Sequence, residues 1–172
     1  LVGPIIITAR SAARADGTPK DVDREFVVAF AELDENQSWY LADNIKELAG
    51  DPKKLKIVKA PFGEVVMAPN FDGNFKETMN GYQFGHLPGL DMKVGERVRW
   101  YLMATTGFEF HSPHWHGNTV LVGGMRTDVS ALLPMGMVVA DMVPDDPGVW
   151  LFHCHVAPHL QWGMQALYHV AK

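Results

Sequence analysis

The segment WLFHCHVAPHLQWGM, residues 150–164, contains the only cysteine of the chain and places a histidine on each side of it. The apolar residues around Cys154 predict a strand over residues 150–156, in which alternate side chains leave opposite faces. His153 and His155 then lie on one face and Cys154 lies on the other. One short strand is therefore predicted to contribute to two different sites.

A second histidine-rich segment, HSPHWHG, begins at His111. The strand period places its other two histidines, His114 and His116, on one face. Those two imidazoles are predicted to meet the histidine pair that flanks the cysteine across adjacent strands, and to hold metal ions with it. His111 lies three residues before His114, an odd offset that turns it toward the cysteine side.

The residues that follow the cysteine supply two further candidate ligands, His159 and Met164. They lie in a short loop that is able to fold back around the thiolate. With His111 and Cys154 they are the ligand types of a blue-copper electron-transfer site, in which Met164 is the weak axial ligand. Zinc fits this set less well, because methionine is a poor zinc ligand. The two histidines outside these segments, His86 and His169, are interpreted as ordinary structural residues.

The composition limits the classes of function. The chain has 172 residues, 47% of them apolar, and a formal net charge of −5. These values predict one soluble domain with an ordinary core. The absence of a basic cluster argues against nucleic acid as a partner. Pro and Asp interrupt the apolar runs well short of the roughly 20 residues that span a bilayer, so no membrane segment is predicted. A first residue other than methionine predicts that an N-terminal piece, such as a signal peptide, is missing.

The strand pattern indicates an all-β fold. Short apolar runs separated by Gly, Pro and Asp turns favour an antiparallel β-sandwich or barrel with few helices. A polar, turn-rich stretch over residues 9–23 is predicted to be an exposed linker, and residues 35–54 to form a short helix or an ordered loop. The predicted strands are residues 1–8, 24–33, 97–101, 118–124, 135–143, 148–156 and 164–172, with further brief strands in the loop-rich segment 56–85.

The two histidine segments resemble the third and fourth copper motifs of the multicopper oxidases, the family of laccases, ceruloplasmin and bacterial two-domain oxidases. The likeness covers nearly the whole chain and includes DREFVVAFAELDENQSWYLADNI and NGYQFGHLPGLDMKVGERVRWYL. A histidine on both sides of the copper cysteine distinguishes these oxidases from copper nitrite reductases, which carry only the preceding one. The resemblance implies a cupredoxin-like Greek-key β-sandwich with one or two short helices, similar to the C-terminal domain of a two-domain oxidase.

The resemblance also assigns roles to the candidate ligands. It implies a type 1 copper held by four residues, which are His111, Cys154, His159 and Met164. It implies half of a trinuclear type 2/type 3 copper cluster held by four others, which are His114, His116, His153 and His155. Cys154 and His159 become the catalytic residues, because His159 faces the electron donor and Cys154 leads to the histidines beside it. The implied activity is laccase-like, with oxidation of phenolic, aromatic-amine or metal-ion donors and reduction of O2 to water.

The other half of the cluster is expected from a second structural unit. Residues 1–20 resemble the end of a preceding cupredoxin domain, and residues 21–172 the copper domain itself. Four further histidines are then expected from that preceding domain or from a neighbouring subunit, in a homotrimer of the full-length protein. A periplasmic or secreted location follows from the same resemblance.

Two other interpretations remain open for the sequence alone. The chain could be a type 1 copper electron-transfer module that never assembles the cluster, or a structural cupredoxin domain without metal. Two smaller features have ordinary interpretations. Four methionines are predicted to fill the core, which are Met125, Met135, Met137 and Met142. Asp141 is interpreted as a turn residue, with a supporting role beside the metal as its alternative.

Overall fold

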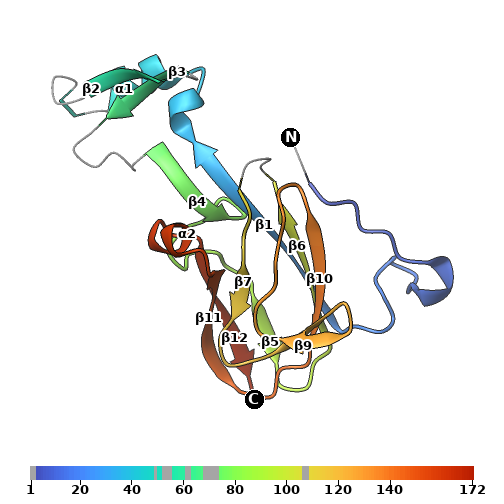
Figure 1. Cartoon of the computed structure of the whole chain (residues 1–172). Coiled ribbons are helices and arrows are strands. Elements are labelled where there is room, and N and C mark those ends of the chain that lie inside the picture. Colours follow the sequence, from blue (N-terminus) through green and yellow to red (C-terminus); the bar gives the residue numbers. More distant parts are fainter. Residues whose placement is uncertain (1–2, 49, 52–55, 61–62, 68–73, 106–108) are drawn as a thin grey trace.

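Two β-sheets face one another in this protein and enclose its core (Figure 1). The structure, a computed structural model, describes residues 3–48, 50–51, 56–60, 63–67, 74–105 and 109–172. Helices are few and short, as predicted. They are the α-helices α1 (Leu41–Leu48) and α2 (Ala157–Gln161) and the 3-10 helices η1 (Arg10–Ala12) and η2 (Glu35–Gln37). The predicted β-sandwich is confirmed.

The larger sheet has six strands in the order β4–β1–β6–β10–β8–β9. They are β1 (Arg24–Asp34), β4 (Phe75–Met79), β6 (Val98–Ala104), β8 (Val120–Val122), β9 (Met125–Thr127) and β10 (Met137–Met142). Every second residue of β1 is buried from Phe26 to Phe30, as expected for a strand with one face on the core. The strand predicted over residues 24–33 is thereby confirmed.

The smaller sheet has four strands in the order β5–β12–β11–β7. They are β5 (Asp91–Lys93), β7 (Pro113–Trp115), β11 (Gly148–Cys154) and β12 (Gln165–Ala171). β11 is the predicted cysteine strand, and it ends two residues earlier than predicted. The predicted antiparallel pairing has two exceptions, since β1 pairs with β6 and β12 with β5 in parallel. Long connections through other elements separate these pairs in the chain, and such connections allow parallel pairing.

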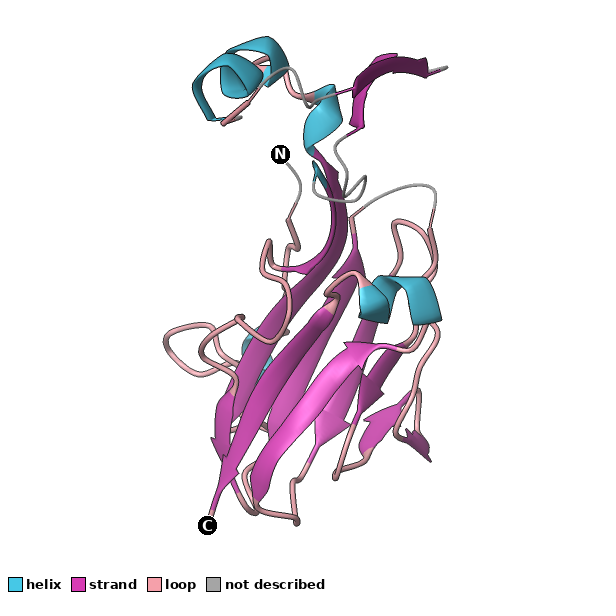
Figure 2. Ribbon diagram, turned by 90° about the vertical axis from the view of Figure 1, so that its left-hand side faces the viewer, coloured by secondary structure: helices cyan, strands magenta, loops and turns pink. Residues whose placement is uncertain are grey.

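A third, small unit lies beyond one end of the sandwich. Strands β2 (Lys56–Ala60) and β3 (Gly63–Met67) form an antiparallel hairpin, and β3 lies beside η2. Figure 2 shows α1 and the hairpin beyond the same end of the sandwich, at upper left and upper right. The predictions of a short helix in residues 35–54 and of brief strands in residues 56–85 are confirmed.

The core is centred on Trp100 of β6. Its ring contacts those of Trp115, Phe152 and Tyr168 at centroid distances of 5.9, 5.0 and 5.9 Å. These three residues belong to β7, β11 and β12, so the contacts join the two sheets. Buried aromatic side chains supply much of the apolar area in such a core. β11 is therefore fixed on its inner face by packing and on both edges by hydrogen bonds.

The strand predicted over residues 1–8 is wrong for the part that the structure describes. Residues 3–9 lie along the larger sheet without strand pairing. Ile5 and Ile7 are 84% and 87% exposed. A β-branched run favours a strand only where a neighbouring strand can pair with it. Among the described residues, no helix has the length and apolar content needed to cross a membrane.

Candidate metal centre

The pairing of β7 with β11 creates two separate sites. In this antiparallel register His114 stands opposite His153 and Pro113 stands opposite Cys154. Neighbouring residues on β11 leave opposite faces, so the cysteine and the histidines separate as predicted. The backbone N–H of His155 donates to the Ser112 carbonyl at 2.7 Å, which extends the pairing beyond the strand end.

The first site lies on the buried face around the thiol. The Nδ1 atoms of His111 and His159 lie 3.9 and 3.6 Å from Cys154 Sγ, and all three side chains are buried. Three donors in a trigonal plane around one metal, at bond lengths of about 2.0 to 2.3 Å, lie about 3.5 to 4.0 Å from one another. The two nitrogen-to-sulfur separations in the structure, 3.9 and 3.6 Å, fall in that range. His111 therefore faces the cysteine side, as its offset predicts.

A short helix returns the chain to this site. Helix α2 follows Val156 with Pro158 in its first turn, where the missing N–H of proline costs no hydrogen bond. The backbone N–H of Met164 then donates to the His159 carbonyl at 2.9 Å, and that of Cys154 donates to the Met164 carbonyl at 3.0 Å. Met164 is fully buried. The predicted loop around the thiol is therefore an ordered turn closed by two hydrogen bonds.

Burial sets the protonation of this group. Desolvation, and secondly the nearby His159, lowers the pKa of His111 to about 4. Desolvation also lowers the pKa of His159 and raises the pKa of the Cys154 thiol. Both imidazoles are therefore neutral near pH 7, which is the form that binds metal. The thiol must lose its proton, and a bound cation supplies the positive charge that makes a buried thiolate favourable.

The second site lies on the opposite face of β11. His114 Nδ1 and His116 Nε2 both lie 3.1 Å from His153 Nε2. The ring of His155 is 5.1 Å from that of His114, so the four imidazoles form one cluster. His153 Nδ1 lies 2.8 Å from the Cys154 carbonyl oxygen, which orients that ring. His116 and His155 are exposed, so the cluster opens to the outside of the molecule.

A third group, which the sequence analysis missed, adjoins the first site. β1 and β4 place Glu32 directly opposite Glu77. The ligand atoms of Glu32, Glu77 and His159 all lie within 4.8 Å of one another, and Glu77 Oε1 is 3.9 Å from His159 Nε2. Burial first, and then Glu32 and Glu109, raise the pKa of Glu77 to about 8. Burial, and then Glu109, raise that of Glu32 to about 7. Opposed carboxyls in a sheet repel one another unless a proton or a cation lies between them.

Comparison with known sequences identifies the family. The family model described as multicopper oxidase matches residues 55–172, more than half of the chain. The chain belongs to the multicopper oxidase family. It is 40% identical to the human protein named Ferroxidase HEPHL1 over 172 residues, which are 99% of this chain and 14% of that protein. It is 37% identical to mouse ceruloplasmin over 171 residues, again 99% of this chain and 15% of that protein.

Solved multicopper oxidases share the fold. One crystal structure has a TM-score of 0.61 at 19% identity and covers 91% of this chain and 46% of its own. The Campylobacter jejuni multicopper oxidase, described as a metallo-oxidase, has a TM-score of 0.59 at 15% identity and covers 90% of this chain and 31% of its own. These similarities confirm the predicted cupredoxin-like fold. This chain spans only about 14–15% of the length of the curated relatives quoted above.

Copper is the cofactor of multicopper oxidases, and the residues of this chain fit it. A buried thiol with two converging imidazole nitrogens, and a thioether residue on the same turn, is the donor set of type 1 copper. His111 Nε2 is buried without a hydrogen-bond partner among the described residues. Its other ring nitrogen, Nδ1, faces the thiol at 3.9 Å and is the atom placed to bind a metal there. The roles of the eight predicted ligands remain assignments by resemblance, and the geometry is compatible with them.

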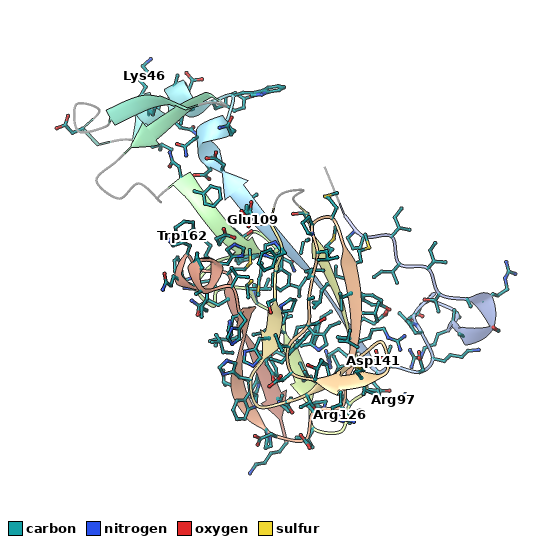
Figure 3. The ribbon with its side chains drawn as sticks, in the orientation of Figure 1. Lys46, Arg97, Glu109, Arg126, Asp141 and Trp162 are labelled. Atoms are coloured by element: carbon teal, nitrogen blue, oxygen red, sulfur yellow. The ribbon has the colours of Figure 1, made fainter. Side chains whose placement is uncertain are left out.

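Two smaller predictions need correction. Met125, Met135 and Met137 are exposed, and only Met142 of the four methionines fills the core. Asp141 lies within β10, where its carboxylate accepts hydrogen bonds from the Arg99 guanidinium at 2.6 and 3.0 Å. Figure 3 shows Asp141 toward the end of the sandwich opposite to Glu109 and Trp162. It is therefore an ion-pair residue of the larger sheet and not a turn residue.

Proposed function

We propose that this chain is the type 1 copper domain of a multicopper oxidase whose electron donor is a divalent metal ion such as Fe(II). We choose a metal ion among the possible donors because Glu32, Glu77 and His159 form a group of candidate metal ligands. The names of two similar proteins support it, since one is called a ferroxidase and another a metallo-oxidase. The laccase-like prediction also included phenolic and aromatic-amine donors. Such organic donors would make no use of the ligand atoms of Glu32, Glu77 and His159.

The carboxylates favour a hard cation over an organic donor. Carboxylate oxygens and an imidazole nitrogen are suitable ligands for divalent first-row metals. Glu32 Oε1 and Glu77 Oε2 are buried and have no hydrogen-bond partner among the described residues. Two such oxygens beside each other are costly when ionised and unpaired, and a cation removes that cost. Glu109 adds a further carboxylate, which favours cations at this end of the sandwich.

The His159 ring connects the carboxylates with the thiol. Its Nε2 lies 3.9 Å from Glu77 Oε1, and its Nδ1 lies 3.6 Å from Cys154 Sγ. When bound, copper supplies one-electron chemistry, accepting electrons from a donor at the type 1 site and reducing O2 to water in a complete trinuclear cluster. The residues of this chain hold the donor cation at one edge of that ring, exclude water from the thiol, and place the second histidine cluster one peptide away.

The complete enzyme needs ligands from another structural unit. We propose that His114, His116, His153 and His155 are half of the trinuclear cluster, and that residues 1–20 belong to the end of a preceding cupredoxin domain. That domain, in the same chain or in a neighbouring subunit of a homotrimer, would supply four further histidines. We propose a periplasmic or secreted location on the same grounds.

The donor assignment is tested by the rate at which the type 1 copper is reduced. This rate is measured without O2 turnover, by stopped-flow loss of the blue absorption of the copper-loaded chain. Replacing Glu77 by Gln removes one ligand charge at nearly constant volume. We expect reduction by Fe(II) to slow about tenfold or more, because loss of a group at a metal site costs about 10- to 100-fold in affinity. Reduction by a phenol should stay within about twofold.

A matched control uses an exposed glutamate of helix α1. Glu47→Gln makes the same chemical change far from His159 in the fold and should leave both rates unchanged. Equal slowing of Fe(II) and phenol by Glu77→Gln would contradict a metal-ion site, because it would indicate general damage to the type 1 copper. An unchanged Fe(II) rate would contradict it directly.

The alternative of a simple electron-transfer module is tested by copper content. About four coppers per complete site and O2 consumption in the full-length protein support the oxidase. One tightly bound copper without O2 consumption in that full-length protein supports the carrier, and no copper at all supports the structural domain.

A further inference from the structure

The loop that follows β4 forms hydrogen bonds with the turn that contains Met164. Residues Gln83–Gly85 follow β4, and residues Trp162–Gln165 follow α2. The Phe84 N–H donates to the Gly163 carbonyl at 2.9 Å, and the Gly85 N–H donates to the Gln165 carbonyl at 3.0 Å. The Gln83 side chain donates to the Trp162 carbonyl at 2.7 Å. Three hydrogen bonds therefore join two segments that are about eighty residues apart.

Phe84 has an unfavourable backbone conformation in this loop. Its φ is +53°, a region that residues other than glycine rarely adopt. Its side chain is also 56% exposed, so ordinary core burial does not explain why phenylalanine stands there. Strained residues of this kind persist where the surroundings over-determine them, and they cluster at functional sites. The strain is an observed outlier that requires a local reason.

The ring of Phe84 lies against Gly163. A Cβ built on Gly163 would lie 3.0 Å from two ring atoms of Phe84 and 2.9 Å from Gln83 Cβ. Gly163 itself has a φ of +105°, so both its conformation and its neighbours require glycine. The turn before Met164 is therefore in close contact with the phenylalanine ring on one side. On its other side, the Cys154 N–H holds the Met164 carbonyl.

The far end of the same loop is fixed to β1. Asn80 and Gly81 have φ values of +51° and +83°, and Met79 and Tyr82 exchange two backbone hydrogen bonds of 2.9 Å. This is the two-residue hairpin turn that Asn-Gly sequences favour. The Asn80 side chain accepts from the Ala29 N–H at 2.7 Å and donates to the Val27 carbonyl at 2.8 Å. The loop is thus a rigid link between the larger sheet and the Met164 turn.

We infer that Phe84 is a positioning residue for the type 1 copper, which holds the Gly163–Met164 turn against Cys154 by its ring and its backbone N–H. This inference rests on the proposed function, because it takes Met164 as the axial ligand. A weak axial ligand contributes to the reduction potential according to its approach to the metal. Phe84 therefore acts on the copper through Met164 and contacts neither donor nor metal.

The test compares Phe84→Ala with two controls in the copper-loaded chain, by voltammetry and visible and EPR spectra. Phe84→Ala should raise the reduction potential, in the same direction as Met164→Leu, and alter the type 1 spectrum. Phe84→Tyr retains the ring and should restore wild-type values. Tyr82→Ala also removes an aromatic ring from this loop. The Tyr82 ring is not among the atoms nearest to Gly163, so this variant should leave the reduction potential unchanged.

A second measurement does not depend on copper. Amide hydrogen exchange at residues 163–165 of the metal-free chain should be about tenfold faster in Phe84→Ala, because a less constrained turn opens more often. If Phe84→Ala does not fold, Phe84→Gly removes the ring and relieves the strain, and it carries the same expectations.

The possible failures are distinguishable. Wild-type potential, spectrum and exchange in Phe84→Ala, or equal shifts in Tyr82→Ala, would overturn the positioning role while the proposed function stood. A wild-type chain that never becomes blue with copper would instead overturn the proposed function. The positioning role of Phe84 at the copper would then be overturned as well. Faster amide hydrogen exchange in Phe84→Ala would in that case support only the contact between Phe84 and the Gly163–Met164 turn.

Discussion

Gly117, which follows His116, lies too close to a tryptophan ring to accept any side chain. A Cβ added there would lie 2.3 Å from Trp150 Cδ2 and 2.5 Å from two further ring atoms. Its φ is +72°, in the left-handed region that favours glycine. Trp150 cannot turn away freely, because its Nε1 donates to the Asp146 carbonyl at 3.0 Å. We therefore expect Gly117→Ala to destabilise the protein substantially.

The magnitude follows from two contributions. A left-handed conformation costs an alanine about 1–2 kcal/mol. Overpacking against a side chain that cannot move freely costs about 1–3 kcal/mol more. The expected total for Gly117→Ala is about 2–5 kcal/mol. Gly123 is a matched control, because its φ is +57° and a Cβ there would have nothing within 4 Å. Gly123→Ala should cost only the backbone contribution of about 1–2 kcal/mol.

The comparison is made by urea unfolding of the metal-free chain, followed by circular dichroism. The free energy of unfolding should fall more for Gly117→Ala than for Gly123→Ala, by about 1–3 kcal/mol. The dependence of this free energy on urea concentration should be similar in the two variants. Equal losses in the two variants would refute the reasoning, since the packing contribution would then be absent.

Three further predictions concern the copper. Cys154→Ser should abolish the intense visible thiolate-to-copper absorption. It should leave the circular dichroism of the fold unchanged, because a serine oxygen can still accept the hydrogen bond that the Ser112 N–H donates to Sγ. A variant that stays blue would exclude Cys154 as the ligand. Met164→Leu should stay blue and show a higher reduction potential in voltammetry, since loss of a weak axial ligand favours Cu(I); an unchanged or lower potential argues against Met164. The isolated chain should bind one copper tightly and consume negligible O2 with a phenolic donor in an oxygen electrode, and the preceding domain should restore turnover; robust turnover by the chain alone, with more than one tightly bound copper, would contradict the shared cluster.

The separation of the two histidine sites could be predicted from the sequence because it depends only on strand period. Adjacent residues of a strand leave opposite faces whatever the rest of the fold does. The offsets within residues 111–116 and 153–155 therefore determined which imidazoles accompany Cys154. The predicted strand of residues 97–101 was found for the same reason, with Val98 and Trp100 buried.

The carboxylate pair could not be found in this way. Glu32 and Glu77 are forty-five residues apart, the first in the predicted strand 24–33 and the second in the loop-rich segment 56–85. Only the register of β1 with β4 places them opposite one another, and that register depends on the Asn80-Gly81 turn and its bonds to β1. The exposed methionines and the unpaired segment 3–9 were misread because composition indicates apolarity but not which neighbour covers it.

The two sites on β11 differ in their exposure to solvent, and this difference supports the proposal that a second structural unit completes the histidine cluster. The cysteine site is closed, since all its candidate ligands are buried within this one domain. The histidine cluster is open, since His116 and His155 are exposed. Reactive intermediates of O2 are protected only where water is excluded and the metals are fully coordinated. A second protein surface that carries imidazoles would both exclude water from the histidine cluster and complete its metal coordination. The cysteine site would then lie one peptide along β11 from the completed cluster.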